Sequence, residues 1–206
     1  MSVLAGKDGA VYLGANKIGY LDTYSLSIEQ GTTETSKFDD QWKEFIGTAK
    51  GWSGSFSGTF DYADTDGQKA IIDDLIGNGG EVTLAFKTSM NLILIGDAQI
   101  SNASVGGSHG DKITISFNFQ GSDGFTKKMA APTFRVEPYS SIGYKVSMNA
   151  GAGATIFYTT NGDDPTEEDN EYSQSIFVAQ TVTFKAIAVM DGYENSDVAS
   201  ITVTVS

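Results

Sequence analysis

The stretch WSGSFSGTFDY, residues 52–62, alternates between bulky apolar side chains or glycine and small polar side chains. Trp52, Phe56, Phe60 and Tyr62 fall on one side of an extended chain, whereas serine, threonine and aspartate fall on the other. Successive side chains of a β-strand point to opposite faces, so the alternation predicts a strand with one buried and one solvated face. Strands of this kind are typical of antiparallel sheets.

The same period of two recurs along the first 125 residues. Within residues 111–120, an apolar set opposes a polar set: Ile113, Ile115, Phe117 and Phe119 against Thr114, Ser116, Asn118 and Gln120. Further strands are predicted over residues 10–13, 18–28, 82–87 and 92–104. One covering helix is predicted within residues 65–80, from an apolar stripe at helical spacing made of Ile71, Ile72, Leu75 and Ile76. Thr65 and Gln68 have the spacing of a capping box at its start.

A long polar segment, QGTTETSKFDDQWKEFIGTAKG, separates two of these strands and spans residues 30–51. It is longer than an ordinary hairpin loop, and it carries the apolar residues Phe38, Trp42, Phe45 and Ile46. Two interpretations of these four residues remain open. Either the loop folds back and buries them on its own domain, or they form a subunit interface with a neighbouring chain, where tryptophan is enriched.

The pattern changes at GSDGFTKKMAAPTF, residues 121–134, where glycines end one strand and an Ala-Ala-Pro sequence opens a new run. Short strands are predicted after it, over residues 145–148, 155–160, 175–178, 181–189 and 198–205. About 75 residues with frequent turns are typical of a small immunoglobulin-like sandwich. The sequence therefore predicts two domains, residues 1–125 and residues 126–206.

The 206-residue chain is acidic throughout, with a formal net charge of −13. Residues 1–125 hold 8 lysines against 16 acidic residues, and residues 126–206 hold 5 basic against 10 acidic residues. Binding to a phosphate backbone depends on lysine and arginine, so the sequence argues against a protein that grips DNA or RNA. The opening MSVLAGKDGA lacks the pattern of a signal peptide, and no apolar run is long enough for membrane insertion.

Few residues are suited to catalysis or metal binding. The chain has no cysteine, and its only histidine, His109, lies in a glycine-rich loop sequence, GGSHGDK. No serine is singled out as the nucleophile of a triad, and the glycine-rich stretches lack the strand-to-helix setting of a nucleotide site. Six acidic residues between Asp163 and Glu171 offer carboxylates to calcium, but they do not match the EF-hand pattern, which favours a solvated acidic turn. We expect no enzymatic activity, no cofactor and no bound metal.

The second part of the chain resembles the immunoglobulin-like module found near the C-termini of chitobiases and hexosaminidases. The resemblance rests on MAAPTF at residues 129–134, ATIFYTTNGDDPT at residues 154–166 and TFKAIAVMDGYENSDVAS at residues 183–200. Related modules are appended to phage virion proteins. Within the second stretch, Asn-Gly favours a turn, and we expect Asn161, Asp163 and Asp164 to form a surface loop.

The first part resembles the major tail tube protein of long-tailed, non-contractile bacteriophages. The resemblance rests on the opening GKDGAVYLG, the strand KIGYLDTYSLSIEQG, the long polar segment, the helix and the closing strand ITISFNFQGSDG. It implies a tail-tube-type β-sandwich or barrel with one flanking α-helix, followed here by a small immunoglobulin-like sandwich. It also implies a virion structural protein, made and assembled in the host cytoplasm, that stacks as hexameric rings into the tube through which DNA is ejected.

The implied partners are other copies of the chain and other tail proteins, namely the tape measure, tail tip and terminator proteins. DNA would pass through a carboxylate-lined tube without specific binding, or along an uncharged face made by residues 53–59 or by residues 114–120. The second domain would project outside the tube, where host surface glycans are one candidate ligand. Two other function classes compete with this reading: a carbohydrate-binding or adhesive β-sandwich protein of a cell surface, and a small hydrolase.

Overall fold

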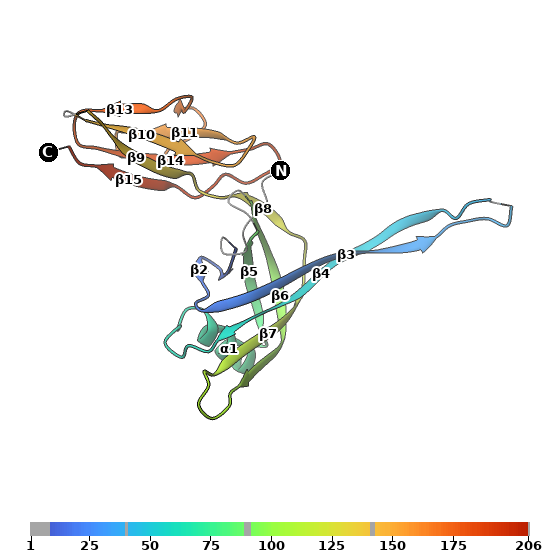
Figure 1. Cartoon of the computed structure of the whole chain (residues 1–206). Helices are drawn as coiled ribbons and strands as arrows, with labels where there is room; N and C mark the ends of the chain where they lie inside the picture. Colours follow the sequence, from blue (N-terminus) through green and yellow to red (C-terminus); the bar gives the residue numbers. More distant parts are fainter. Residues whose placement is uncertain (1–8, 40, 89–91, 141–142, 206) are drawn as a thin grey trace. The chain divides into compact units, whose positions relative to one another are not determined.

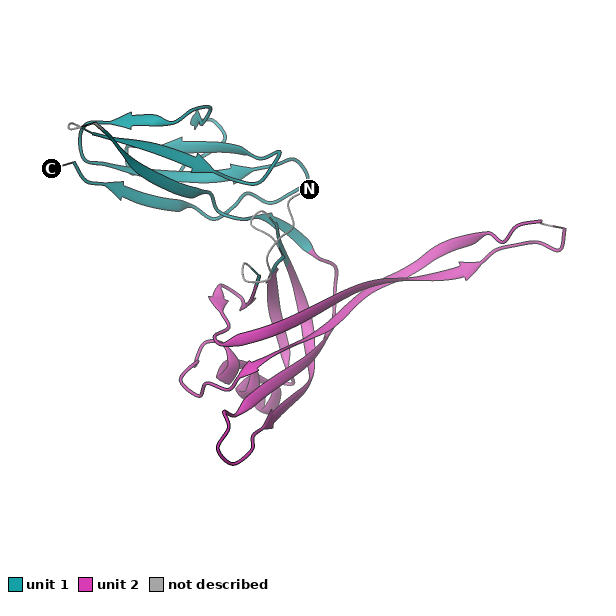
Figure 2. Cartoon of the chain, in the orientation of Figure 1, with its two compact units in different colours: residues 1–9, 87–94, 126–206 teal, residues 10–86, 95–125 magenta. Residues whose placement is uncertain are grey.

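The computed structural model describes residues 9–39, 41–88, 92–140 and 143–205. These residues are mostly β, as expected, with one helix, α1 (Gln68–Gly77). Residues 10–86 and 95–125 form one compact unit, the sheet unit, and residues 126–206 form the sandwich unit together with two short segments (Figure 2). The domain boundary after residue 125 stays a prediction. The first eight residues, where the sequence predicts no signal peptide, lie outside the described part.

The sheet unit is built on one large sheet with the strand order β2-β1-β5-β6-β7-β4-β3 (Figure 1). Its strands are β1 (Ala10–Leu13), β2 (Asn16–Lys17), β3 (Leu21–Glu34), β4 (Phe45–Thr59), β5 (Glu81–Lys87), β6 (Leu92–Gly106) and β7 (Thr114–Gly121). The short strand β8 (Thr126–Met129) falls within the sandwich unit. The predictions for β1, β5, β6 and β7 agree with these bounds within three residues. In contrast, β3 and β4 extend well beyond the predicted strands.

The buried face of this sheet is aromatic, as the alternation predicts. Phe56 of β4 packs against Phe117 of β7 with the ring centroids 5.0 Å apart, and Phe86 of β5 packs against Phe119 of β7 at 5.4 Å. Because β5 and β7 are separated by β6 in the strand order, the sheet must curl around its own core. The predicted alternation fails at two strand ends. β4 stops at Thr59 and Tyr62 is exposed, and Ile113, just before β7, is 50% exposed.

Helix α1 is fixed to the sheet by one fully buried polar side chain, Gln68. Its Nε2 donates hydrogen bonds to the carbonyl oxygens of Gly19 (2.8 Å) and Thr59 (3.0 Å). Its Oε1 accepts a hydrogen bond from the backbone N–H of Asp61 at 3.0 Å. Both ends of the amide are thus satisfied by backbone groups, as a buried side chain of this kind requires.

Two expectations for this helix are wrong. Gln68 does not close a capping box with Thr65, because its side chain is engaged with the backbone of the neighbouring strands. The N–H of Gln68 is instead bound by the carboxylate of Asp64 at 3.0 Å. In the expected apolar stripe Ile71 is buried, but Ile76 is exposed, since it lies in the last turn of the helix.

The sandwich unit consists of two antiparallel sheets, with strand orders β13-β10-β9 and β12-β11-β14-β15. The strands are β9 (Thr133–Ser140), β10 (Gly143–Asn149), β11 (Thr155–Thr159), β12 (Asn170–Glu171), β13 (Ile176–Val178), β14 (Val182–Val189) and β15 (Ala199–Val203). Val146, Ile156 and Phe184 form its buried centre with side chains from both sheets. This arrangement confirms the expected immunoglobulin-like sandwich, although β9 was not predicted.

Replacing Gln68 by alanine is expected to lower the free energy of unfolding of the sheet unit by about 2–4 kcal/mol, because the substitution leaves three backbone groups without their partner. The measurement is urea unfolding followed by the fluorescence of buried Trp52, in a Trp42→Phe background that leaves one tryptophan to report. Gln41→Ala, which removes the same side chain from an exposed position, should change the value by less than about 0.5 kcal/mol. Equal losses in both variants would contradict the anchoring role.

Candidate assembly interface

Strands β3 and β4 continue beyond the sheet as a two-stranded ribbon, defined here as residues 30–50 including the connecting turn (Figure 1). β4 pairs with β7 only from Ser53 to Thr59. Before Ser53, the only described strand that pairs with β4 is β3. Figure 2 shows the ribbon extending away from the rest of the sheet unit. All its described residues are exposed except Ser36, which is half-buried.

The ribbon corrects the expectation of a loop over residues 30–51. Strand pairing includes Thr33 opposite Ile46 and Glu34 opposite Phe45, so the true connection covers residues 35–44. Because both faces of the ribbon are solvated, its strands carry no alternation between apolar and polar residues, and period-two analysis cannot detect them. An ion pair between Lys43 of the connection and Glu34 at the end of β3, 2.9 Å long, also links the two sides of the ribbon.

The four apolar residues predicted as a subunit interface all lie in solvent. Phe38 is fully exposed, Trp42 is 84% exposed, and Phe45 and Ile46 are 57% and 56% exposed. Phe45 and Ile46 are neighbours on one strand and therefore point to opposite faces of the ribbon. The alternative interpretation, in which the segment folds back and buries them on its own domain, is wrong. Clustered apolar surface of this kind is typical of contact sites for other molecules.

The sheet has an open edge at β3. This strand ends the strand order, and β4 is the only described strand that pairs with it along its 14 residues. In the described residues, the large sheet of the expected tail-tube-type β-sandwich or barrel curls around its core and is open at this edge. A long edge strand offers backbone donors and acceptors to a strand of another chain.

Over β3, β4 and β7 the solvated face of the sheet carries mostly small uncharged polar side chains, here called the hydroxyl-amide face, with the carboxylates of Glu29 and Asp97 beside it. It comprises Thr23, Ser25 and Ser27 of β3, Ser53, Ser55, Ser57 and Thr59 of β4, and Thr114, Ser116, Asn118 and Gln120 of β7. Hydroxyl pairs link β3 to β4, with Thr23 Oγ1 2.9 Å from Ser57 Oγ and the Oγ atoms of Ser25 and Ser55 3.1 Å apart. The two candidate uncharged linings, residues 53–59 and residues 114–120, are thus one surface.

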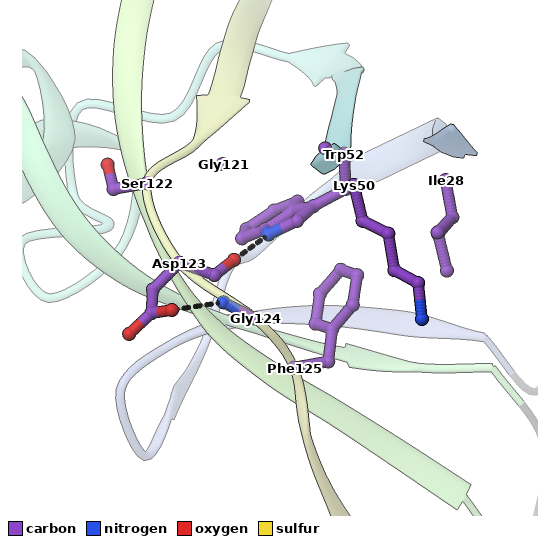
Figure 3. A pocket seen from close by; sticks show the side chains of 9 residues that line it. Ile28, Lys50, Trp52, Gly121, Ser122, Asp123, Gly124 and Phe125 are labelled. Atoms are coloured by element: carbon purple, nitrogen blue, oxygen red, sulfur yellow. Dashed lines mark hydrogen bonds between the residues drawn. The ribbon is translucent and has the colours of Figure 1, made fainter. Parts of the chain in front are cut away.

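A cavity of about 360 Å³ lies at the root of the ribbon (Figure 3). Trp52 and Phe125 line it with their ring centroids 4.3 Å apart, and Ile28 adds a further apolar side chain that is 60% exposed. The indole Nε1 of Trp52 donates a hydrogen bond to the carbonyl oxygen of Asp123 at 2.5 Å, which fixes the ring. Lys50 also lines the cavity and forms no ion pair with any described residue.

Gly121 gives the indole of Trp52 the room it occupies. A Cβ atom at Gly121 would collide with the indole ring, and one at Gly96 would lie 2.8 Å from its Cζ2 atom. The ring therefore rests directly on the backbone of β6 and β7 where the ribbon leaves the sheet. This close approach explains why glycine occupies both positions.

In the sandwich unit, the predicted surface residues Asn161, Asp163 and Asp164 lie in an exposed turn after β11. The Oδ1 atom of Asn161 accepts a hydrogen bond from the N–H of Asp163 at 3.1 Å, and Gly162 between them has φ 95°. Asp164 forms an ion pair with Lys185 at 2.8 Å. In the described part of the chain, no three acidic or histidine side chains gather in a way that could hold a metal ion.

Sequence reasoning missed one exposed aromatic pair in the sandwich unit. Tyr139 and Phe177 are 64% and 49% exposed, and their ring centroids lie 5.7 Å apart. The Nζ atom of Lys145 lies 6.0 Å from the centre of the Tyr139 ring. The alternation in TFRVEPYS could have revealed strand β9, but Pro138 within it argues against a strand in most settings.

The comparisons with known proteins agree with both expected resemblances. Residues 138–200 match the family model of the chitobiase/beta-hexosaminidase C-terminal domain. In fold, the chain is similar to a chain in the virion of a native gene transfer agent particle, with 20% identity, a TM-score of 0.56, and coverage of 61% of this chain and 99% of that one. A chain in the tail of an empty gene transfer agent particle with C6 symmetry gives 22% identity, a TM-score of 0.52, and coverage of 60% and 98%.

No curated protein sequence matches the chain. Among the described residues, no helix has the length and apolar character needed to cross a membrane. Both resemblances stated for the sequence are therefore confirmed as likenesses of fold. About 60% of the chain is similar to chains of tail particles, and residues 138–200 match the chitobiase-type module.

In the unassembled protein, backbone amides of residues 45–50 are expected to exchange with solvent at least about tenfold faster than those of residues 54–58. The two groups belong to the same strand, but residues 54–58 have a paired neighbour on each side, whereas an isolated two-stranded hairpin is only marginally stable in water. Hydrogen–deuterium exchange measured on the full chain tests this. Equal protection along β4 would contradict the description of the ribbon as a weakly supported element.

Proposed function

We propose that this chain is a virion structural protein that assembles with copies of itself into the tube of a phage-type tail. The observation that carries the proposal is the ribbon, which holds Phe38, Trp42, Phe45 and Ile46 in solvent. Exposed apolar side chains at such a density are costly unless another molecule covers them. A second copy of the chain can cover them in every subunit of an assembly.

Ring formation is supported by the open edge of β3. A ring needs a heterologous contact, in which one surface of a subunit meets a different surface of the next subunit until the circle closes. The ribbon and the β3 edge both lie at one end of the strand order. Other surfaces of the sheet unit remain free to contact the neighbouring subunit on the other side of the ring. The C6 symmetry of the similar tail particle supports a ring of six subunits.

The hydroxyl-amide face is our candidate lining of the tube. DNA carries one negative charge for about every 1.7 Å of its axis, so a lysine-rich or arginine-rich lining would hold it. The 11 residues named for this face are uncharged, the charged groups beside them, Glu29 and Asp97, are carboxylates, and the chain as a whole has a net charge of −13. Such a lining gives passing DNA hydrogen-bonding contact but no counter-charge, which suits passage during ejection.

The sandwich unit takes no part in this wall. Residues 138–200 of this unit match the chitobiase-type module. We place the unit on the outside of the tube, where the loop of Asn161, Asp163 and Asp164 faces solvent. The proposed role is structural and non-catalytic. It requires further tail proteins at the two ends and in the lumen of the tube, namely tail tip, terminator and tape measure proteins, with assembly in the host cytoplasm.

Replacing Trp42 and Phe45 together by alanine is expected to raise the protein concentration needed for assembly by about tenfold or more, since a truncated interface anchor of this type costs about 1–2 kcal/mol or more. The unfolding midpoint of the unassembled protein should not change, because both side chains are exposed. Negative-stain electron microscopy and sedimentation measure the rings and rods. Rods of the unchanged protein should also carry projections on their outer surface.

The matched control is Tyr62→Ala, which removes an exposed aromatic side chain from the sheet unit outside the ribbon. It should assemble as the unchanged protein does. If the unchanged protein stays monomeric at high concentration, even when tail tip complexes are added as seeds, the proposed function is wrong. Unaltered assembly of the Trp42→Ala, Phe45→Ala variant would refute the role of the ribbon.

A second candidate function, binding of cell-surface carbohydrate, is supported by one observation in the sandwich unit. Tyr139, Phe177 and Lys145 form an exposed aromatic and cationic group on the sheet of β9, β10 and β13. Aromatic rings in solvent combine apolar surface with a polar tip, which suits the apolar faces and hydroxyl groups of sugars. This reading applies to the sandwich unit alone and is compatible with its place outside a tube.

If this second function holds, the full chain should be retained on insoluble host cell-wall polysaccharide in a co-sedimentation assay. Tyr139→Ala is expected to reduce retention by about tenfold, comparable to the loss of one aromatic anchor. Tyr62→Ala, in the other unit, should leave retention unchanged. Absence of retention for the unchanged protein would exclude the second candidate without bearing on assembly.

A further inference from the structure

The cavity at the root of the ribbon has the size and chemistry to receive one large apolar side chain. Its volume of about 360 Å³ is near the lower end of the range for ligand pockets, which begins at about 300 Å³. Phe125 and Ile28 supply the accessible apolar surface, whereas Trp52 is only 4% exposed and packs against Phe125, with its indole held in place by the hydrogen bond to Asp123 (Figure 3). A pre-formed aromatic wall of this kind favours another aromatic side chain as its occupant.

The ribbon tip of the same molecule cannot fill this cavity. Phe45 lies seven positions before Trp52 on β4, and at about 3.4 Å per position the two are roughly 24 Å apart along the strand. Over this length β4 is paired to β3, with partners from Glu34 opposite Phe45 to Ile28 opposite Trp52. The paired ribbon therefore leads away from the cavity, and any ribbon tip that enters it must belong to another copy.

We propose that the cavity beside Trp52 binds the ribbon tip of a second copy of this chain, with Trp42 of that copy as the inserted side chain. The inference rests on the proposed function and specifies the contact by which the subunits join. Trp42 is 84% exposed in the described chain, and its insertion would bring three aromatic rings together. Each molecule then gives one ribbon and receives another, which is the heterologous contact that a closed ring or a stack requires.

Charge also favours this occupant. Residues 34–44 contain four acidic residues and two lysines, and Glu34 already pairs with Lys43. Lys50 at the cavity lacks an ion-pair partner among the described residues, so it can approach a tip carboxylate such as Glu44. The carboxylate of Asp123, which also lines the cavity, accepts a hydrogen bond from the N–H of Gly124 at 2.7 Å, so its charge is partly satisfied locally.

Cross-linking through introduced cysteines tests the contact directly, because the natural chain has no cysteine. Gln41→Cys labels the tip next to Trp42, and Ser122→Cys labels the cavity. When the two single variants are mixed under assembly conditions and treated with a short bis-maleimide, we expect a covalent dimer that contains one copy of each. Gln41→Cys mixed with Asn78→Cys, at the far end of α1, should give no such dimer.

A second variant tests the cavity without relying on cross-linking. Gly124 lines the cavity, and a Cβ atom there meets nothing within 4 Å, so Gly124→Phe can fill the space from within the same chain. We expect it to raise the concentration needed for assembly by about tenfold or more, as the loss of an anchor contact would. Gly77→Phe, at a position where a Cβ is equally unhindered, should have no effect.

The outcomes separate this inference from the proposed function. Rings or rods that form without the Gln41–Ser122 cross-link, and that Gly124→Phe does not weaken, would overturn the cavity contact and leave the tube proposal standing. A protein that never assembles would overturn both. A specific cross-link together with weakened assembly of Gly124→Phe would support both.

Discussion

The rest of this account depends on one element, a two-stranded β-ribbon whose two faces are both exposed to solvent. Its hydrogen bonds run between two strands only, and such hairpins are marginally stable alone. Here the ribbon also carries Phe38, Trp42, Phe45 and Ile46 into solvent. Burial of a large apolar side chain contributes about 1.5–3 kcal/mol, so covering these four residues with another molecule would contribute a substantial free energy of association.

The sheet unit provides a rigid base for this ribbon. The aromatic cluster of Phe56, Phe86, Phe117 and Phe119 curls the sheet around its core, and Gln68 ties the helix to the backbone near the start of β3 and the end of β4. Trp52 lies where the solvated ribbon becomes a buried strand. Its indole donates a hydrogen bond to the carbonyl oxygen of Asp123 and packs directly on the backbone of Gly121, where a Cβ atom would collide with it. One strand, β4, therefore joins the stable core, the cavity and the exposed apolar residues Phe45 and Ile46.

Most of the fold could be predicted from the sequence wherever one face of an element is buried. The alternation of residues 52–59 and 113–120 identified two central strands and their buried faces, because the core imposes a period of two. The ribbon could not be found in this way, since neither of its faces is buried. Gln68 was assigned to a cap because its position beside a helix start is equally consistent with that role. The apolar residues of the candidate interface were recognised from composition, whereas the cavity beside Trp52 is formed by residues 28, 50–52 and 121–125, whose proximity only the folded chain reveals.

The central claim is that copies of this chain cover one another's ribbons and open β3 edges. Electron cryo-microscopy of the protein assembled at high concentration tests it most directly. The account predicts rings or a hollow tube in which the ribbon of each subunit is buried against a neighbouring copy and the hydroxyl-amide face lines the channel. An assembly held together through the sandwich units, with every ribbon and every β3 edge still in solvent, would contradict it.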